Sequence, residues 1–299
     1  MAVVAVPKPL GHPLPGGHAG ATVRLRPLLG GEIACPPGFF ASDHPGGRIA
    51  LLRAFFSRRS SWAWAPVPAF LLEHPDAGHV LVDTAMHASV AMVPADNLGA
   101  VGARLNRFRG VGEGIPGRLR ELGVDPRKVR TVVMTHLHSD HASGVVEFPN
   151  ATFVVDAREW AAASAGGATK GYHHPQFDHA FDWRTVDFDG QLSQGLSPFG
   201  RSVDLFGDGS VRLLSTPGHT LGHQSVLVRL RGRDALLVGD AAHTRETIGG
   251  DALPLVWADE HLFRRSLREI RRFVASEPAA LVIPGHDPDA WAELDEVYD

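Results

Sequence analysis

The sequence predicts an α/β fold in which β-strands and helices form a sandwich within a single domain. From about Val23 onward, short apolar runs of β-type residues alternate with turn signals, which is the pattern of sheet strands. Helical patterns lie between some of these runs. Neither an internal repeat nor a linker divides the 299 residues, so one domain over residues 1–299 is the simplest organisation.

The N-terminal part of the chain is predicted to differ from this core. Residues 1–22 are dense in proline and glycine, a composition that resists both helix formation and strand pairing, so we expect an arm or loop there. The segment 36–68 follows and contains the aromatic residues Phe39, Phe40, Phe55, Phe56, Trp62 and Trp64. We expect this segment to have one of three roles: it lines an apolar substrate groove, packs within the core, or forms the contact of a homodimer. These roles stay open because aromatic residues dominate cores and interfaces alike.

Eight apolar runs are predicted as the strands of the core. They cover residues 69–72, 80–84, 131–135, 151–155, 211–215, 225–230, 235–238 and 281–283. Helical patterns cover residues 115–122, 157–164 and 259–275, and in the last of these five apolar residues line one face. Its opposite face carries Arg264, Arg265, Arg268, Arg271 and Arg272. We interpret this basic stripe as a solvated face rather than an anion-binding or membrane-binding surface, because glutamates are interspersed.

Composition excludes several classes of function. The chain has 29 basic and 33 acidic residues, a net charge of -4, which argues against a nucleic-acid partner. Cys35 is the only cysteine, so neither an internal disulfide nor a thiolate-rich metal site is expected. The apolar run at residues 2–6 is too short for a secretory leader. No apolar stretch approaches the ~18 to 20 residues of a bilayer span, so we expect a cytoplasmic protein without a membrane partner.

The strongest chemical signal is a cluster of four potential metal ligands directly after the apolar run 131–134. His136, His138, Asp140 and His141 lie within six residues of one another, at a strand end where a loop can present side chains. His136 and His138 are two residues apart and point to the same side of an extended backbone, whereas Asp140 and His141 turn toward a second centre. Imidazole with carboxylate suits zinc and similar divalent ions, unlike the oxygen-only sites of calcium or magnesium.

Three further potential ligands also follow apolar strands. His219 comes after the run 211–214, Asp240 ends the run 236–240, and His286 ends the run 281–286. A glycine beside each lets the backbone pass close to a crowded centre. The remaining histidines, such as His12, His18, His44, His74, His79 and His87, are interpreted as surface residues or satisfied core groups.

These residues, in this order, resemble the metallo-β-lactamase superfamily over the chain from about Pro68 to its C-terminus. The resemblance implies an αββα sandwich, in which two packed mixed β-sheets are flanked by helices. It also implies two bound metal ions, Zn²⁺ in the first place, with iron, cobalt or manganese as alternatives. By this likeness one metal is bound by His136, His138 and His219, the other by Asp140, His141 and His286, and Asp240 bridges both.

The longer motifs are similar to those of one branch of this superfamily, the quorum-quenching N-acyl homoserine lactonases. The similar stretches are STPGHTLGHQS at 215–225, PVPAFLL at 66–72 and GHD at 285–287. Asp240 as a bridging carboxylate argues against true β-lactamases, which have cysteine or serine there. The chain departs from the lactonase pattern at Ser143-Gly144, where a glycine pair is common, and at His243, where these lactonases carry tyrosine.

The resemblance implies a hydrolase that opens the ring of N-acyl homoserine lactones or related lactones. A hydroxide shared by the two metals attacks the lactone carbonyl, because coordination lowers the pKa of water to roughly 7. Asp140 is the candidate to shuttle the proton to the departing alkoxide. His243 is the candidate to donate a hydrogen bond to the carbonyl oxygen or to protonate the leaving group.

Other functions use the same ligands and stay open at this point. A thioesterase of the glyoxalase II type, an arylesterase or a phosphotriesterase would differ only in the substrate pocket. An iron-dependent redox member would share the ligands, although the sequence shows no flavin-binding segment to supply electrons. A non-catalytic scaffold is disfavoured because every ligand position is retained.

Overall fold

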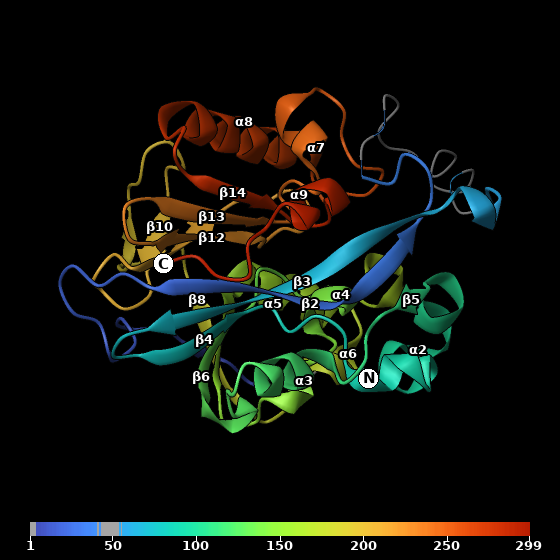
Figure 1. Cartoon of the computed structure of the whole chain (residues 1–299), viewed down its shortest axis with the longest axis horizontal. Helices are drawn as coiled ribbons and strands as arrows, with labels where there is room; N and C mark the ends of the chain where they lie inside the picture. The colour runs from blue at the N-terminus through green and yellow to red at the C-terminus, as the bar shows by residue number, and fades with distance from the viewer. Residues whose placement is uncertain (1–3, 41, 43–53, 55) are drawn as a thin grey trace.

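The computed structural model describes residues 4–40, 42, 54 and 56–299 of the chain. It contains two β-sheets that pack face to face, with helices on the outer side of each (Figure 1). The predicted αββα sandwich is therefore confirmed.

The first sheet has eight strands in the order β1-β8-β7-β6-β4-β3-β2-β5. These are β1 (Lys8–Pro9), β2 (Arg24–Cys35), β3 (Ala63–His74), β4 (Gly78–Val82), β5 (Phe108–Arg109), β6 (Val129–Val133), β7 (Thr152–Asp156) and β8 (Asp182–Val186). Strands β2, β3 and β4 pair antiparallel, whereas β4, β6, β7 and β8 pair parallel. The sheet is thus mixed, and the loop after β6 leaves from the carboxyl ends of its parallel strands.

The second sheet has six strands in the order β14-β13-β12-β11-β10-β9. These are β9 (Ser193–Gln194), β10 (Ser202–Asp204), β11 (Val211–Ser215), β12 (Gln224–Arg229), β13 (Asp234–Gly239) and β14 (Leu281–Pro284). All neighbours pair antiparallel except β13 and β14, which are parallel. The ends of β13 and β14 therefore reach the same edge of the sheet.

Eight α-helices are described, together with five short 3-10 helices. The α-helices are α2 (Pro94–Leu105), α3 (Gly114–Glu121), α4 (Ser139–Ala142), α5 (Ala157–Ala165), α6 (His174–Phe177), α7 (Arg245–Gly249), α8 (Glu260–Ser276) and α9 (Pro288–Ala292). The 3-10 helices are η1 (Arg59–Ser61), η2 (Ala88–Ala91), η3 (Pro126–Lys128), η4 (Val145–Glu147) and η5 (Ala168–Lys170). Helix α8 begins after Asp259, whose side chain accepts the N–H of Leu262, as an N-cap residue does.

Alternation along the strands divides the apolar side chains among three layers. Phe70 and Leu72 of β3 face the second sheet and pack with Val226 and Val228 of β12. The intervening side chains of β3 face outward and pack against α2, α3 and α5. Leu227 of β12 likewise faces outward, into the cluster that α8 covers. Burial of these faces, worth roughly 25 cal/mol per Å² of apolar surface, holds the layers together.

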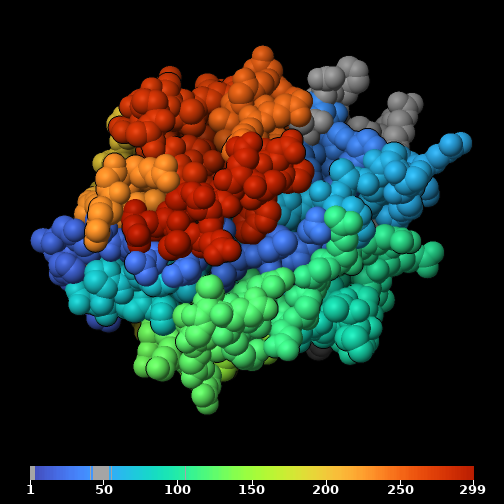
Figure 2. Space-filling model, in the orientation of Figure 1, coloured from blue at the N-terminus to red at the C-terminus, as the bar shows by residue number. Residues whose placement is uncertain are grey.

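All eight predicted strands and all three predicted helices are present, with bounds within two residues of the prediction except that β3 begins six residues earlier, at Ala63. The prediction for residues 1–22 was wrong in one respect, because Lys8 and Pro9 form β1 and pair parallel with β8. Proline was expected to resist pairing because it has no N–H to donate. An edge strand such as β1 pairs on one side only, so Pro9 is tolerated there. Leu25 of β2 and Tyr298 near the C-terminus form an isolated β-bridge. The C-terminal part of the chain, red in Figure 2, accordingly lies against the blue N-terminal part.

The surface predictions are tested only in part. Arg264 and Arg265 pair with glutamates on α8, as expected for a face of balanced charge. Arg271 departs from the predicted solvated face, because it donates to the carbonyl oxygens of Thr247 and Ile248 in α7. No described helix is both long and apolar enough to cross a bilayer. Most of the segment 41–53, together with His44 and Phe55, lies outside the described residues.

Candidate metal centre

Four strand ends bring the seven predicted ligands together. The loop after β6 and helix α4 contribute four of them, the loop after β11 contributes His219, and the ends of β13 and β14 contribute Asp240 and His286. Gly285, beside the last of these, allows this convergence, because a Cβ atom there would lie 2.5 Å from an oxygen of Asp240. Residues from both sheets therefore meet at one edge of the sandwich.

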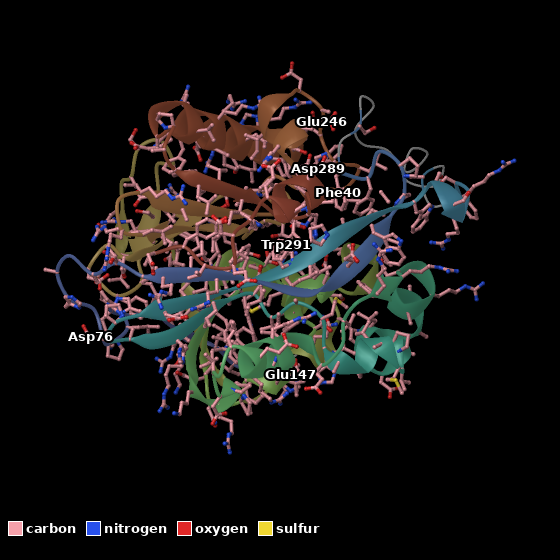
Figure 3. The ribbon with its side chains drawn as sticks, in the orientation of Figure 1. Phe40, Asp76, Glu147, Glu246, Asp289 and Trp291 are labelled. Carbon is pink, nitrogen blue, oxygen red and sulfur yellow. The ribbon has the colours of Figure 1, made fainter. Side chains whose placement is uncertain are left out.

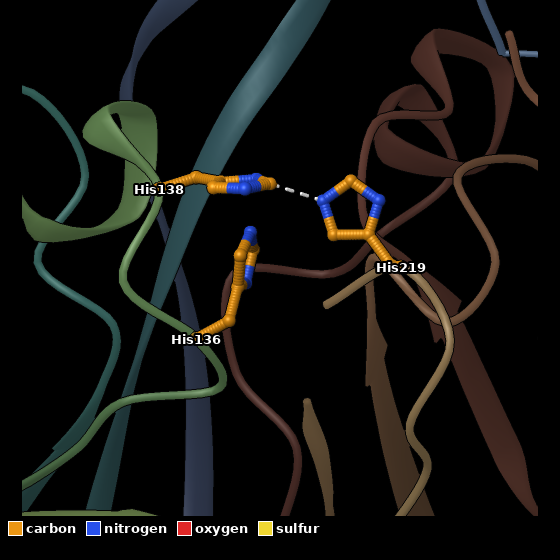
Figure 4. A group of neighbouring side chains, drawn as sticks. All are labelled: His136, His138 and His219. Carbon is orange, nitrogen blue, oxygen red and sulfur yellow. Dashed lines mark hydrogen bonds between the residues drawn. The ribbon is translucent and has the colours of Figure 1, made fainter. Parts of the chain in front are cut away.

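The first group of side chains consists of His136, His138 and His219 (Figure 4). One nitrogen of each lies within 4.8 Å of the others, and Nδ1 of His138 is 2.9 Å from Nε2 of His219. The Nε2 atom of His136 is buried and has no hydrogen-bond partner. Three ring nitrogens thus point at one small volume, the arrangement that a divalent cation requires.

The second group consists of Asp140, His141 and His286. Oδ2 of Asp140 lies 3.5 Å from Nε2 of His286 and 3.9 Å from Nε2 of His141. Asp140 is the more exposed of the two aspartates at the centre, with 20% of its side chain accessible against 5% for Asp240. Its carboxylate therefore borders the open side of the centre.

Asp240 lies between the two groups and directs one oxygen to each. Oδ1 is 3.5 Å from Nε2 of His141 and 3.2 Å from Nε2 of His286. Oδ2 is 3.3 Å from Nε2 of His219 and 3.8 Å from Nε2 of His136. This is the geometry of a carboxylate that can bridge two cations.

Hydrogen bonds behind the rings orient three of the imidazoles. Nδ1 of His286 donates to the carbonyl oxygen of Pro66, and Nδ1 of His141 donates to a carboxylate oxygen of Asp83, each at 2.8 Å. The hydroxyl of Thr135 donates to Asp83 and therefore accepts from Nδ1 of His136, at 3.1 Å. In each ring Nδ1 is the donor to the protein, and Nε2, which faces the centre, is the nitrogen available to a metal.

Burial and charge act strongly on these groups. Burial holds the pKa of His136 and His219 well below the usual value. Burial would raise the pKa of Asp240, but the surrounding imidazoles, His286 first, hold it well below its usual value. Burial lowers the pKa of His141, yet Asp240 and the other nearby carboxylates outweigh it and raise that pKa well above normal. The centre thus carries fixed negative charge that favours a cation.

The donor set fits divalent metal ions. Nε2 of His136, Nε2 of His141 and Oδ1 of Asp240 are buried polar atoms without a hydrogen-bond partner. Leaving such atoms unpaired would cost several kcal/mol, whereas coordination satisfies all of them at once. Imidazole and carboxylate donors of this kind suit zinc and its neighbours among the transition metals.

His243 lies at the centre, just past the end of β13 as predicted. Its Nε2 atom is 3.2 Å from Oδ2 of Asp240, and its Nδ1 atom is buried without a partner. It also forms a group with His219 and Asp240 whose ligand atoms lie within 4.8 Å of one another. The ring of Phe40, labelled in Figure 3, packs at 5.2 Å from that of His243 and stacks on His286 at 5.4 Å.

Sequence reasoning missed several residues that support the centre. Asp83 was predicted only as part of the strand 80–84, although its backbone has a φ of 59°, a conformation that non-glycine residues adopt mainly at constrained sites. Glu159 is fully buried and accepts the N–H of Leu137, between two ligand histidines, at 2.9 Å. His223 accepts the N–H of Asp240 at 2.9 Å. The only available signal for His223 was its place in the motif at 215–225.

Comparisons with known proteins identify a family for the chain. The family model of the metallo-beta-lactamase superfamily matches residues 62–286. The N-acyl homoserine lactonase AttM of Azorhizobium caulinodans is 36% identical over 233 residues, 76% of this chain and 83% of the relative. AttM of Agrobacterium fabrum is 37% identical over 236 residues, 77% of this chain and 84% of the relative.

Solved structures show the same fold. An N-acyl homoserine lactone hydrolase with the product N-hexanoyl-L-homoserine bound at its catalytic metal centre superposes with a TM-score of 0.70 at 24% identity. The match covers 92% of this chain and 97% of that protein. With its fold, its clustered ligand residues and a family match over most of its length, the chain belongs to the metallo-beta-lactamase superfamily.

Proposed function

We propose that the chain is a dinuclear metal-dependent hydrolase that opens the lactone ring of N-acyl homoserine lactones or closely related lactones. The observation that carries the proposal is the position of Asp240, with one oxygen facing each group of ligands. Relatives named as N-acyl homoserine lactonases, at 36–37% identity over three quarters of the chain, supply the substrate class.

In this proposal His136, His138 and His219 would hold one metal, Asp140, His141 and His286 would hold the other, and Asp240 would contribute to both. Zinc suits these donors best, while iron, cobalt and manganese remain alternatives with the same ligands. Bound divalent metals would polarise the substrate carbonyl and lower the pKa of water toward neutrality. No side chain is then required as the base for the attack.

Asp140 is proposed to move the proton to the departing ring oxygen. Its side chain lies on the accessible side of the centre, and Oδ2 is held 3.5 Å from Nε2 of His286. A carboxylate in this position can accept a proton on one side of the reaction and release it on the other. Asp240 is too enclosed for that exchange, since only 5% of its side chain is accessible.

His243 is proposed to act on the substrate. It would donate a hydrogen bond to the carbonyl oxygen or protonate the leaving group, the place that tyrosine takes in the lactonases that this chain resembles. The half-buried ring of Phe40 packs against it and supplies an apolar wall beside the reacting atoms. The substrate partner in this proposal is a small molecule with both a polar ring and an apolar chain.

A panel of substrates tests the proposal. Purified protein with zinc would be assayed on N-acyl homoserine lactones, simple lactones, thioesters, aryl esters and phosphotriesters. The expected result is the largest kcat/KM on an acyl homoserine lactone. A larger value on a thioester, aryl ester or phosphotriester would refute the lactonase assignment and leave a different hydrolase on the same metal centre.

A further inference from the structure

His223 lies beneath the candidate centre but belongs to neither group of proposed ligands. Its side chain is fully buried, and its ring centre is 5.3 Å from that of His136. Nε2 accepts the backbone N–H of Asp240 at 2.9 Å, and Nδ1 lies 3.0 Å from the hydroxyl of Thr216. Both ring nitrogens are therefore used in the protein itself, and none is left to bind a metal.

His223 belongs to a series of linked hydrogen bonds, and the two groups at the ends of the series fix the direction of each bond. The hydroxyl of Ser225 donates to the carbonyl oxygen of Val238, which can only accept. Ser225 must then accept from the hydroxyl of Thr216, 2.8 Å away, and Thr216 must accept from Nδ1 of His223. At the other end the backbone N–H of Asp240 can only donate, so Nε2 carries no proton. Both ends require the same neutral tautomer.

This series of hydrogen bonds begins and ends at the C-terminal end of β13. It runs from the carbonyl of Val238, through three side chains, to the N–H of Asp240. Between those two residues Gly239 takes a φ of 58°, and a Cβ atom there would lie 2.8 Å from Nε2 of His223. Only glycine fits against the ring in this conformation. The ring therefore sets the point at which β13 ends and Asp240 turns into the centre.

We propose that His223 is a positioning residue that fixes the backbone of Asp240, and through it the binding of both metals. This inference rests on the proposed function only in taking Asp240 as the bridge. A loss of ring orientation would move the carboxylate relative to both ligand groups at once. Outer partners of metal ligands typically contribute ten- to hundredfold in metal affinity.

Two substitutions at His223 separate the loss of the hydrogen-bond acceptor for Asp240 from the loss of the packed ring. Glutamine at His223 can place its amide oxygen near the position of Nε2 and keep the bond from Asp240, whereas asparagine reaches only the position of Nδ1. We expect His223→Asn to weaken zinc binding ten- to hundredfold and His223→Gln to retain most of it. Thr216→Val, which leaves the ring in place but removes its partner, should give a smaller loss of a few-fold.

His74 provides a matched control. Its side chain is also fully buried and accepts two backbone N–H groups at Nδ1, from Asp76 and Ala77, but it pairs with Asp208 and is not among the described candidate metal-binding groups. His74→Asn should lower the unfolding temperature without changing zinc affinity.

The measurement is the affinity for both zinc ions, by competition with a chromophoric chelator, beside the unfolding temperature of each metal-free variant. Wild-type affinity in His223→Asn, or equal losses in His223→Asn and His223→Gln, would overturn the inference. If His223→Asn does not fold, unchanged affinity in Thr216→Val would overturn it instead. A wild-type protein that binds no zinc would refute the proposed function, a result distinguishable from these.

Discussion

Replacing Asp240 by asparagine is the sharpest perturbation of the proposed bridge. The amide keeps the shape of the side chain but removes its charge and turns one oxygen into an NH₂ group, which has no lone pair for a metal. Oδ1 faces His141 and His286, and Oδ2 faces His219 and His136. Whichever way the amide turns, one ligand group loses its fourth donor and the other retains only a neutral oxygen.

The expected loss can be bounded from below. Removing an outer partner of a ligand costs ten- to hundredfold in metal affinity, and a direct bridging ligand should cost more. We therefore expect one zinc ion to bind at least about a hundredfold more weakly, on the order of 3 kcal/mol, with loss of most turnover. Chelator competition and elemental analysis measure the metal, and lactone hydrolysis measures the turnover. Two retained zinc ions and normal turnover in Asp240→Asn would show that the bridging assignment is wrong.

Three further predictions follow from the same structure. Asp140→Asn should weaken only the metal held with His141 and His286, so that close to one zinc per chain survives dialysis; loss of both would contradict the division into two groups. His243→Ala and His243→Phe should lower turnover by roughly ten- to a thousandfold with metal content unchanged, while His243→Tyr keeps part of the lactonase activity; loss of metal in His243→Ala would identify a ligand instead. Glu147→Gln should stabilise the protein at alkaline pH, because burial raises the pKa of Glu147 to about 8. The unfolded chain ionises near the ordinary value of 4.5, so the wild type loses stability as pH rises from there to about 8, by on the order of 5 kcal/mol. Urea unfolding of both proteins at pH 5 and pH 8 checks this, and an equal pH dependence would refute it.

The candidate ligands could be recognised from the sequence because each carries a local signature. His136, His219, Asp240 and His286 all follow an apolar run that forms a buried strand, and their positions could be identified one segment at a time. The long strand β2 was not predicted, because Pro27 and the glycine pair at 30–31 interrupt its run of apolar residues. Its antiparallel pairing with β3 overrides that local signal, with a register shift between Leu29 and Glu32.

The supporting residues were not predicted because their roles arise from distant contacts. Pro66 and His286 are 220 residues apart, and Asp83 and His141 are 58 apart. A carbonyl oxygen carries no sequence signature at all, so its bond to His286 could emerge only from the folded chain. His223 was visible in the motif, but its function depends on the tautomer that Thr216 and Asp240 impose together.

The most direct test of the central claim is a zinc titration of metal-free protein, read out as hydrolysis of an N-acyl homoserine lactone through proton release. We predict no significant hydrolysis without metal, a rise as zinc is added and a plateau close to two equivalents per chain. Full activity in the metal-free protein, or two bound zinc ions without lactone hydrolysis, would contradict a dinuclear metal-dependent lactonase.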